Sequence, residues 1–277
     1  MIFGSFPLDA ALGTVVAHSH RLEGRVLKKG TVLDEAAVEA LRAAGRQSVI
    51  AARLEPGDVG ENEAAEILAH AVHGAGLAAG RAGSGRVNLH ADAPGLLLVD
   101  RAQVDRINLL HESLTFGTLP DATVVAARDM VATIKVIPFA VPGAVLHEVE
   151  TLLRDGAPPL TLHPFRKLRV GLAVSELPGL KESVLEGTIE ATAARVQALG
   201  GSMLPAIRCA HDEVAIAEAF TALRTAGAEL VMVAGASATV DRRDVGPAGI
   251  VRAGGRIIHF GMPVDPGNLI CVGELDG

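Results

Sequence analysis

The chain has 277 residues, of which 49% are hydrophobic and 21% charged, enough apolar material for more than one core. Its formal net charge of −7 argues against a general nucleic-acid-binding protein, which normally carries a basic face. Two cysteines, Cys209 and Cys271, are too few for a disulfide framework or a zinc site. We see no signal peptide and no apolar run near the ~20 residues of a membrane span, so we expect a cytoplasmic protein that binds neither nucleic acid nor membranes.

The first 165 residues mix helical and strand patterns. Helices are predicted over residues 31–44, with Asp34 as the cap, and over residues 61–73, and a strand over residues 48–52. The five glycines of residues 74–85 predict either a flexible connection or a tight binding loop.

Further along, residues 104–112 are helical in pattern and residues 130–136 have strand composition. Pro138 and Pro142 then interrupt regular pairing. Three more prolines follow by residue 164, which places the main domain boundary near residue 165. We therefore expect a mixed α+β N-terminal region over residues 1–165, in one or two subdomains, and a second domain over residues 166–277.

The second domain alternates strands and helices. That alternation implies βαβ units and a parallel sheet. The strands are expected at 169–175, 203–207, 229–234 and 256–260, and the helices at 183–199, 211–225 and 245–253.

In an open parallel sheet, ligands bind beyond the carboxyl ends of the strands. Four places meet this rule, and they hold Ser175 and Glu176, Asp212, residues 235–244, and residues 262–268. An acid in such a place is a metal ligand, a base or a helix cap, and Asp212 sits where a cap belongs.

The third place, GASATVDRRD, is the most informative. Small residues let backbone amides approach an anion, Arg242 and Arg243 could neutralise a phosphate, and Asp241 or Asp244 could hold Mg²⁺. The alternative is a tight turn in which Asp244 only caps the next helix.

Three other signals are weak. The pair His18 and His20 lacks a third metal ligand. The run from Gly83 to Arg86 could be a phosphate loop but lacks the Lys-Ser/Thr ending of one. Lys135 either reaches an anionic ligand or lies on the solvated face of a strand.

Residues 168–277 resemble the molybdopterin-binding domain shared by molybdopterin adenylyltransferases and molybdopterin molybdotransferases. The resemblance is carried by RVGLAVSE, HDEVAIAEAF, ELVMVAGASATVDRRDV with Pro247, and HFGMPVDPGN. The phrases GRVLKKGTVLDEAAVEALRAAG, ARLEPGDV and MVATIKVIPFAVP extend it. Nearly the whole chain then looks like a family of molybdopterin-binding proteins often fused to, or found beside, a nucleotidyltransferase.

The resemblance implies a three-layer parallel-sheet molybdopterin-binding domain at the C-terminus. It assigns Asp212 and Asp244 to catalysis or to Mg²⁺. Together with the strand-end positions and the charged loop, it gives these expected cofactor-binding residues: Ser175, Glu176, Gly235, Ala236, Ser237, Asp241, Arg243, Pro266 and Gly267.

The chain departs from that family in two ways. The Gly-Gly-Thr-Gly loop of the adenylyltransferases is Gly235-Ala236-Ser237-Ala238 here, and the chain stops at Gly277, where relatives continue, so we expect a truncated domain.

The loss of glycines favours a protein that binds molybdopterin or the molybdenum cofactor during biosynthesis or delivery. A cofactor nucleotidyltransferase or a molybdenum hydroxylase is the expected partner, and a homo-oligomer the expected assembly. One alternative is an enzyme, a Mg²⁺-dependent molybdopterin adenylyl- or molybdotransferase. Another is an unrelated α/β enzyme that binds a mononucleotide.

Overall fold

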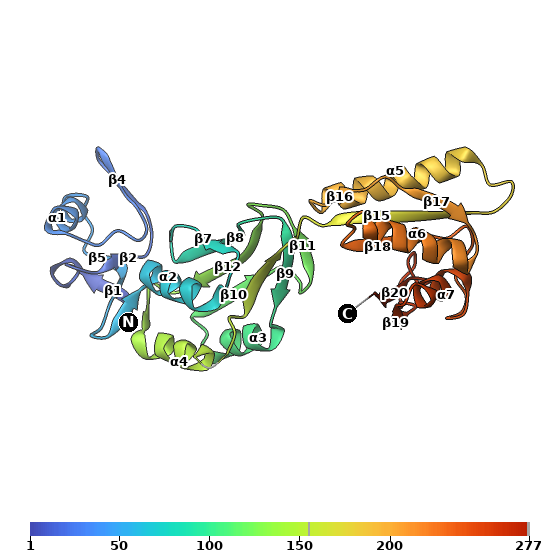
Figure 1. Ribbon diagram of the computed structural model, residues 1–277. Coiled ribbons are helices and arrows are strands. Elements are labelled where there is room, and N and C mark those ends of the chain that lie inside the picture. Colours follow the sequence, from blue (N-terminus) through green and yellow to red (C-terminus); the bar gives the residue numbers. More distant parts are fainter. Residues whose placement is uncertain (155, 276–277) are drawn as a thin grey trace. The chain divides into compact units, whose positions relative to one another are not determined.

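The structure, a computed structural model, describes residues 1–154 and 156–275. The chain divides into two compact units, Met1–Pro164 and Phe165–Gly277 (Figure 1). Both units mix helices with strands, so the fold class is mixed α/β. Within the described residues, every helix is too short or too polar to cross a membrane.

The beginning of unit 1 is a small antiparallel sheet with one helix. The helix α1 (Glu35–Ala43) buries Val38 and Leu41, and the Asp34 carboxylate accepts a hydrogen bond of 2.7 Å from the Ala37 amide, which confirms the predicted cap. The sheet has the order β1-β5-β2 and the strands β3 and β4 form a hairpin. The remaining bounds are β1 (Ile2–Pro7), η1 (Leu8–Ala10), β2 (Val15–Val16), β3 (His20–Leu22), β4 (Arg25–Leu27) and β5 (Ser48–Arg53).

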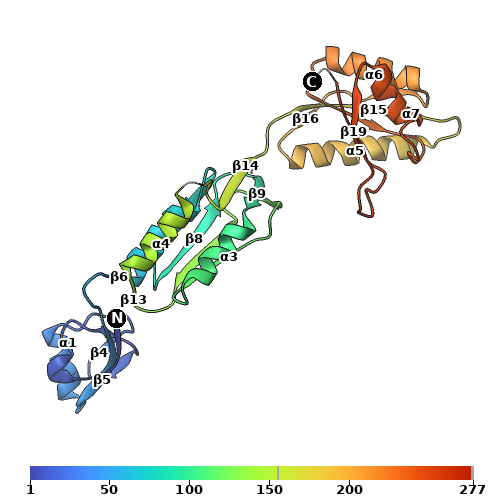
Figure 2. The same cartoon turned by 90° about the horizontal axis from the view of Figure 1, so that it is seen from below.

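The rest of unit 1 has a hydrophobic core of its own. A four-stranded antiparallel sheet, β10-β12-β8-β7, is joined by the smaller sheets β11-β9-β14 and β13-β6. Three helices contribute apolar side chains to the same core, and Figure 2 shows α3 and α4 side by side over the strands. The bounds are β6 (Asp58–Gly60), α2 (Glu61–Val72), β7 (Leu77–Ala79), β8 (Arg86–Ala91), β9 (Gly95–Val99), α3 (Arg101–Leu110), β10 (Leu114–Thr118), β11 (Thr123–Val125), β12 (Met130–Val136), β13 (Ala140–Pro142), α4 (Gly143–Leu153) and β14 (Leu160–Pro164).

Unit 1 differs from the sequence prediction in three places. The helix α3 begins three residues early, because the Asp100 carboxylate accepts from the Gln103 amide and caps it. The helix α4 was not predicted at all, since the prolines hid it, yet Pro142 lies at its N-cap, where a missing amide proton costs nothing. Residues 74–85, predicted as a loop, include the strand β7.

Unit 2 is built around β15 (Arg169–Glu176), whose central residues are buried. Parallel strands flank it on both edges: β16 (Ser202–Met203) and β17 (Ile207–Ala210) share one edge, and β18 (Leu230–Ala234) takes the other. Both faces are covered as well. Leu172 and Val174 pack toward α5 (Glu182–Ala198), whereas Ala173 packs toward α6 (Glu213–Thr225) and α7 (Val245–Arg252), as Figure 1 shows for α5 and α6.

The sheet departs from expectation in two places. The predicted strand 203–207 is divided into β16 and β17, with residues 204–206 in neither, and the last predicted strand has a different partner. Residues 256–260 were predicted as a fourth parallel strand. The strand β19 (Arg256–Phe260) instead pairs antiparallel with β20 (Cys271–Glu274), and within the described residues it has no ladder with the parallel sheet. Apolar composition predicts a strand but not its partner, and this partner is the next element of the chain, after the connection 261–270.

The contact between α6 and α7 depends on a glycine. A Cβ atom at Gly249 would lie 2.5 Å from Cγ2 of the fully buried Ile216. We expect Gly249→Ala to lower the free energy of unfolding of unit 2 by about 1–3 kcal/mol through overpacking. Gly187, in the middle of α5, has open space around it, so Gly187→Ala should raise that free energy by up to about 1 kcal/mol. Urea unfolding followed by hydrogen exchange of unit 2 amides measures both, and equal signs for the two variants would contradict the packing described.

Candidate functional site

The carboxyl ends of β15, β17 and β18 meet at one edge of the sheet and are joined there by a histidine. The Nδ1 atom of His211 lies 2.8 Å from Oγ of Ser175, and its Nε2 atom lies 3.0 Å from Oγ of Ser237. The Ala236 amide donates to Ser175 Oγ at 3.1 Å. Ser175 is only 1% exposed. From this buried position its hydroxyl group bonds both to the histidine and to the loop that follows β18, and so holds the two together.

The distances favour one arrangement of protons in this cluster. The other acceptor within reach of the Ser175 hydroxyl, the Ala234 carbonyl, is 3.4 Å away, which is too long for a good O–H···O bond. Ser175 therefore donates to Nδ1 of His211, and the Nε2–H group donates to Ser237 Oγ. The hydroxyl proton of the exposed Ser237 is then free to donate to a ligand.

The loop after β18 also presents backbone donors. Among the described residues, the amides of Ser237, Ala238 and Thr239 have no hydrogen-bond partner. Three successive free amides beside a hydroxyl and an imidazole offer an anion several hydrogen-bond donors at one place. The loop that was predicted from its small residues therefore has backbone N–H groups that could still donate hydrogen bonds to a ligand.

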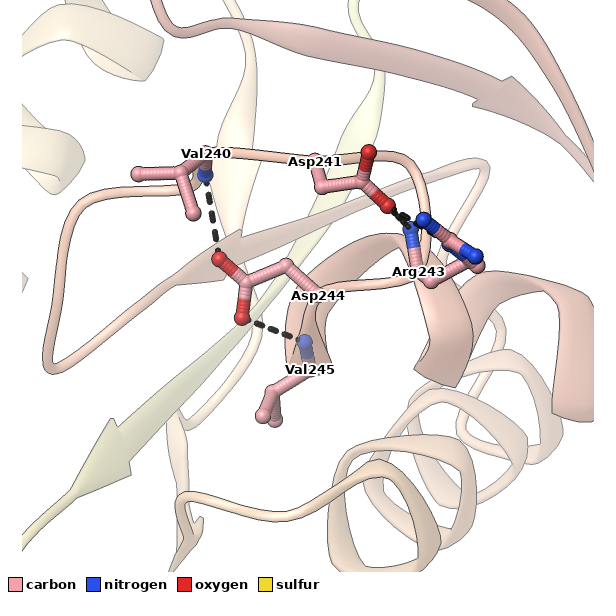
Figure 3. A network of polar contacts seen from close by, with 5 residues as sticks. All are labelled: Val240, Asp241, Arg243, Asp244 and Val245. Atoms are coloured by element: carbon pink, nitrogen blue, oxygen red, sulfur yellow. Dashed lines mark hydrogen bonds and ion pairs between the residues drawn. The ribbon is translucent and has the colours of Figure 1, made fainter.

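At the charged end of this loop, Asp241, Arg243 and Asp244 form hydrogen bonds with nearby residues of the chain (Figure 3). Oδ2 of Asp244 accepts from the Val240 amide at 3.0 Å and Oδ1 from the Val245 amide at 2.8 Å, which caps α7. These two bonds, with a smaller contribution from the charge of His211, lower the pKa of Asp244. Asp244 therefore has the capping role that was left open as an alternative.

Asp241 and Arg243 form an ion pair within the same loop. Oδ1 of Asp241 accepts from the backbone amide of Arg243 at 2.9 Å and from its Nε at 3.0 Å, which lowers the pKa of Asp241 (Figure 3). Arg242, by contrast, has no ion-pair partner in the described part of the chain. Of the two arginines, Arg242 has the guanidinium that remains available to a ligand.

Two further acids have structural partners. Oδ1 of Asp212 accepts from the amides of Val214 and Ala215, both at 2.9 Å, and caps α6. Glu176 pairs with Arg208 at 2.8 Å, which raises the pKa of that guanidinium further above its usual range. Within the described residues there is no group of three or more His, Cys, Asp or Glu side chains that could hold a metal ion, so a Mg²⁺ site at Asp212 and Asp244 stays a prediction.

Pro266 and Gly267 do not take part in the hydrogen bonds that join Ser175, His211 and Ser237. They belong to the exposed connection between β19 and β20, which is closed by bonds from Gly261 N to Ile270 O and from Met262 N to Asn268 O. Within the described residues, no hydrogen bond joins this connection to Ser175, His211 or Ser237.

The sequence predicts that Ser175, Gly235, Ala236 and Ser237 lie together at the carboxyl ends of the parallel strands, and the structure places them there. The sequence prediction missed His211, because residue 211 was assigned to the helix that follows. The available signal was its position directly after a parallel strand, next to Asp212.

Comparison with known proteins adds little to the geometry. A model of a domain of unknown function (DUF8806) matches residues 5–53. No curated protein matches the sequence. Among solved structures, the molybdopterin biosynthesis MoeA protein from Pyrococcus horikosii is similar at 12% identity and a TM-score of 0.30, over 99% of this chain and 68% of that one.

The roles of Asp212 as a cap and as a charge can be separated by substitution. Asp212→Ala removes the acceptor for two amides and should lower the free energy of unfolding by about 1 kcal/mol, whereas Asp212→Asn keeps an acceptor and should lower it by a few tenths. Urea titration followed by far-UV circular dichroism measures both. If Asn were as destabilising as Ala, the charge rather than the cap would be the stabilising feature.

Asp244 should make stability depend on pH in acid. Its folded-state pKa lies below the ordinary value of 3.8, so its contribution is fully present above pH 3.8 and is lost as the pH falls through the folded-state pKa. The difference in unfolding free energy between the wild type and Asp244→Asn should therefore shrink as the pH falls below about 4. A difference that stays constant between pH 6 and pH 2.5 would contradict the assignment.

Proposed function

We propose that unit 2 binds molybdopterin or the molybdenum cofactor, with the phosphate of the ligand at the carboxyl ends of β15, β17 and β18. The observation that carries the proposal is the loop after β18, where three unpartnered amides stand beside the free hydroxyl of Ser237 and the ring of His211. A phosphate oxygen takes such donors readily. The sequence resemblance supplies the choice of a pterin over other phosphorylated ligands.

The donors define where the phosphate binds. The first turn of α7 is already covered by its own cap, Asp244, so the phosphate binds to the amides of residues 237–239 rather than to that helix N-terminus. Arg242 supplies the balancing charge, because Arg243 is held by Asp241.

The aspartates favour binding over chemistry. In Asp244 each carboxylate oxygen accepts one amide, and in Asp212 one oxygen accepts two. Catalysis through Mg²⁺ would draw on groups that already hold two helices in place. We infer a carrier, which holds the pterin for a nucleotidyltransferase or a molybdenum hydroxylase; the three-layer family fold and the homo-oligomer belong to the same proposal.

Titration of the protein with molybdopterin, its adenylylated form and ATP tests the proposal. The carrier should bind the pterin forms without turning over ATP. Ser237→Ala and Arg242→Gln should each weaken pterin binding about tenfold, the value of one charge-assisted hydrogen bond. Ser183→Ala, an exposed serine at the start of α5, is the matched control and should leave the affinity unchanged.

Other outcomes select the alternatives. Turnover of ATP in the presence of molybdopterin would replace the carrier by an adenylyltransferase. Binding of ATP without affinity for any pterin would identify an unrelated mononucleotide enzyme. No binding of any pterin form would exclude the proposed function.

A further inference from the structure

Unit 1 contains a cavity of about 730 Å³ that plays no part in the site of unit 2. This volume lies in the range of small-molecule binding sites, roughly 300–1,000 Å³. Its lining includes three basic side chains and a single acidic one, Glu61, in a chain whose formal net charge is −7. The residues that matter below are Phe3, Lys29, Arg86, Lys135, Ile137 and Phe139.

Two of the basic residues oppose each other directly. Arg86 in β8 and Lys135 in β12 are paired in the antiparallel register, and like charges at such positions destabilise a sheet. Glu61 compensates in part, with its Oε2 atom 3.7 Å from Nζ of Lys135. Arg86 and Lys29 have no carboxylate partner among the described residues. An anion in the cavity would relieve this repulsion.

The adjacent glycine-rich turn fixes the lysine rather than binding an anion itself. Ser84 and Gly85 both have positive φ, at 49° and 70°, as in the two-residue hairpin turns of type I′. Gly83 and Arg86 bond to each other, and the Gly85 amide donates to Oδ1 of Asn62. The amides of the suspected phosphate loop are therefore largely used.

The Ser84 carbonyl accepts a hydrogen bond of 2.5 Å from Nζ of Lys135. This bond and the ion pair with Glu61 hold the lysine at the cavity wall, where it is 25% exposed. Positive charge in the cavity therefore comes from positioned side chains and not from a nest of amides.

Large apolar side chains form the other part of the lining. Phe3 and Ile137 line the cavity and are 57% and 56% exposed, so both present apolar surface to it. Nζ of Lys29 lies 5.5 Å from the ring centroid of Phe139, so the charge stands directly over an aromatic face. Apolar and aromatic surface next to a cluster of cations fits a flat ring that bears a phosphate.

We propose that this cavity binds a phosphorylated small molecule with a flat ring, in the class of nucleoside monophosphates and pterin phosphates. The phosphate lies between Arg86 and Lys29, and the ring packs against Phe3 and Ile137. This site lies in unit 1 and goes beyond the function proposed for unit 2.

Isothermal titration of the full chain with AMP, GMP, neopterin monophosphate, adenosine and inorganic phosphate tests the proposal. At least one of the three ring phosphates should bind more tightly than inorganic phosphate and than adenosine. Arg86→Gln and Lys29→Gln should each weaken that binding about tenfold or more. Arg81→Gln and Lys28→Gln, basic neighbours outside the cavity, are the matched controls and should leave it unchanged.

Two further measurements distinguish a binding role of Arg86 from a structural one, and unit 1 from unit 2 as the place of binding. Without ligand, Arg86→Gln should raise the melting temperature, because it removes a like-charge pair, whereas an arginine with a purely structural role would lower it. Ser237→Ala should leave binding of the ring phosphates intact; its loss in that variant would place the ligand in unit 2. The proposal is overturned if none of the ring phosphates binds, or if Arg86→Gln and Lys29→Gln both bind like the wild type.

Discussion

The central strand β15 is the constraint on which unit 2 depends. It is hydrogen-bonded on both edges and buried on both faces, so neither its register nor its direction can change without breaking three strand pairings and two hydrophobic clusters. Because its neighbours run parallel to it, their carboxyl ends arrive at the same edge. Ser175, fixed near the end of this strand, is consequently able to hold His211 and the loop after β18 at once.

The same geometry explains why acids at strand ends mislead functional reasoning. A parallel strand is followed by a helix, and that helix needs a cap for its free amides. Asp212 and Asp244 meet that need, with carboxylate oxygens bonded to the first amides of α6 and α7. Position at a strand end therefore does not separate a ligand-binding acid from a capping one. Unused hydrogen-bonding capacity does, and in this loop it belongs to backbone amides.

The sequence was sufficient wherever one local pattern determines the structure. The run 169–175 predicts the buried strand β15, residues 61–73 predict α2, and Asp34 predicts the start of α1. It was insufficient where composition leaves the partner of a strand open or where local signals compete. The pairing of β19 with β20 and the helix α4 behind Pro142 are of this kind.

The candidate site shows the same division. Strand-end logic located Ser175 and residues 235–237, because chain direction alone fixes that edge. The role of His211 depends on two serines, 36 positions before it and 26 after it, and no spacing rule connects them.

Sequence and structure agree locally in most of a folded protein, and the exceptions concentrate at functional positions. The charge cluster 241–244 looked like a phosphate site by composition, yet most of its groups are bonded within the loop (Figure 3). Two exceptions stand out instead: free amides at residues 237–239, and the opposed cations Arg86 and Lys135. The opposed cations are unfavourable in the isolated chain, the amides have hydrogen-bonding capacity that the fold does not use, and an anion is the kind of group that both would bind. Unrelieved polar groups therefore point more directly to ligands than the residue types by which sites are usually recognised.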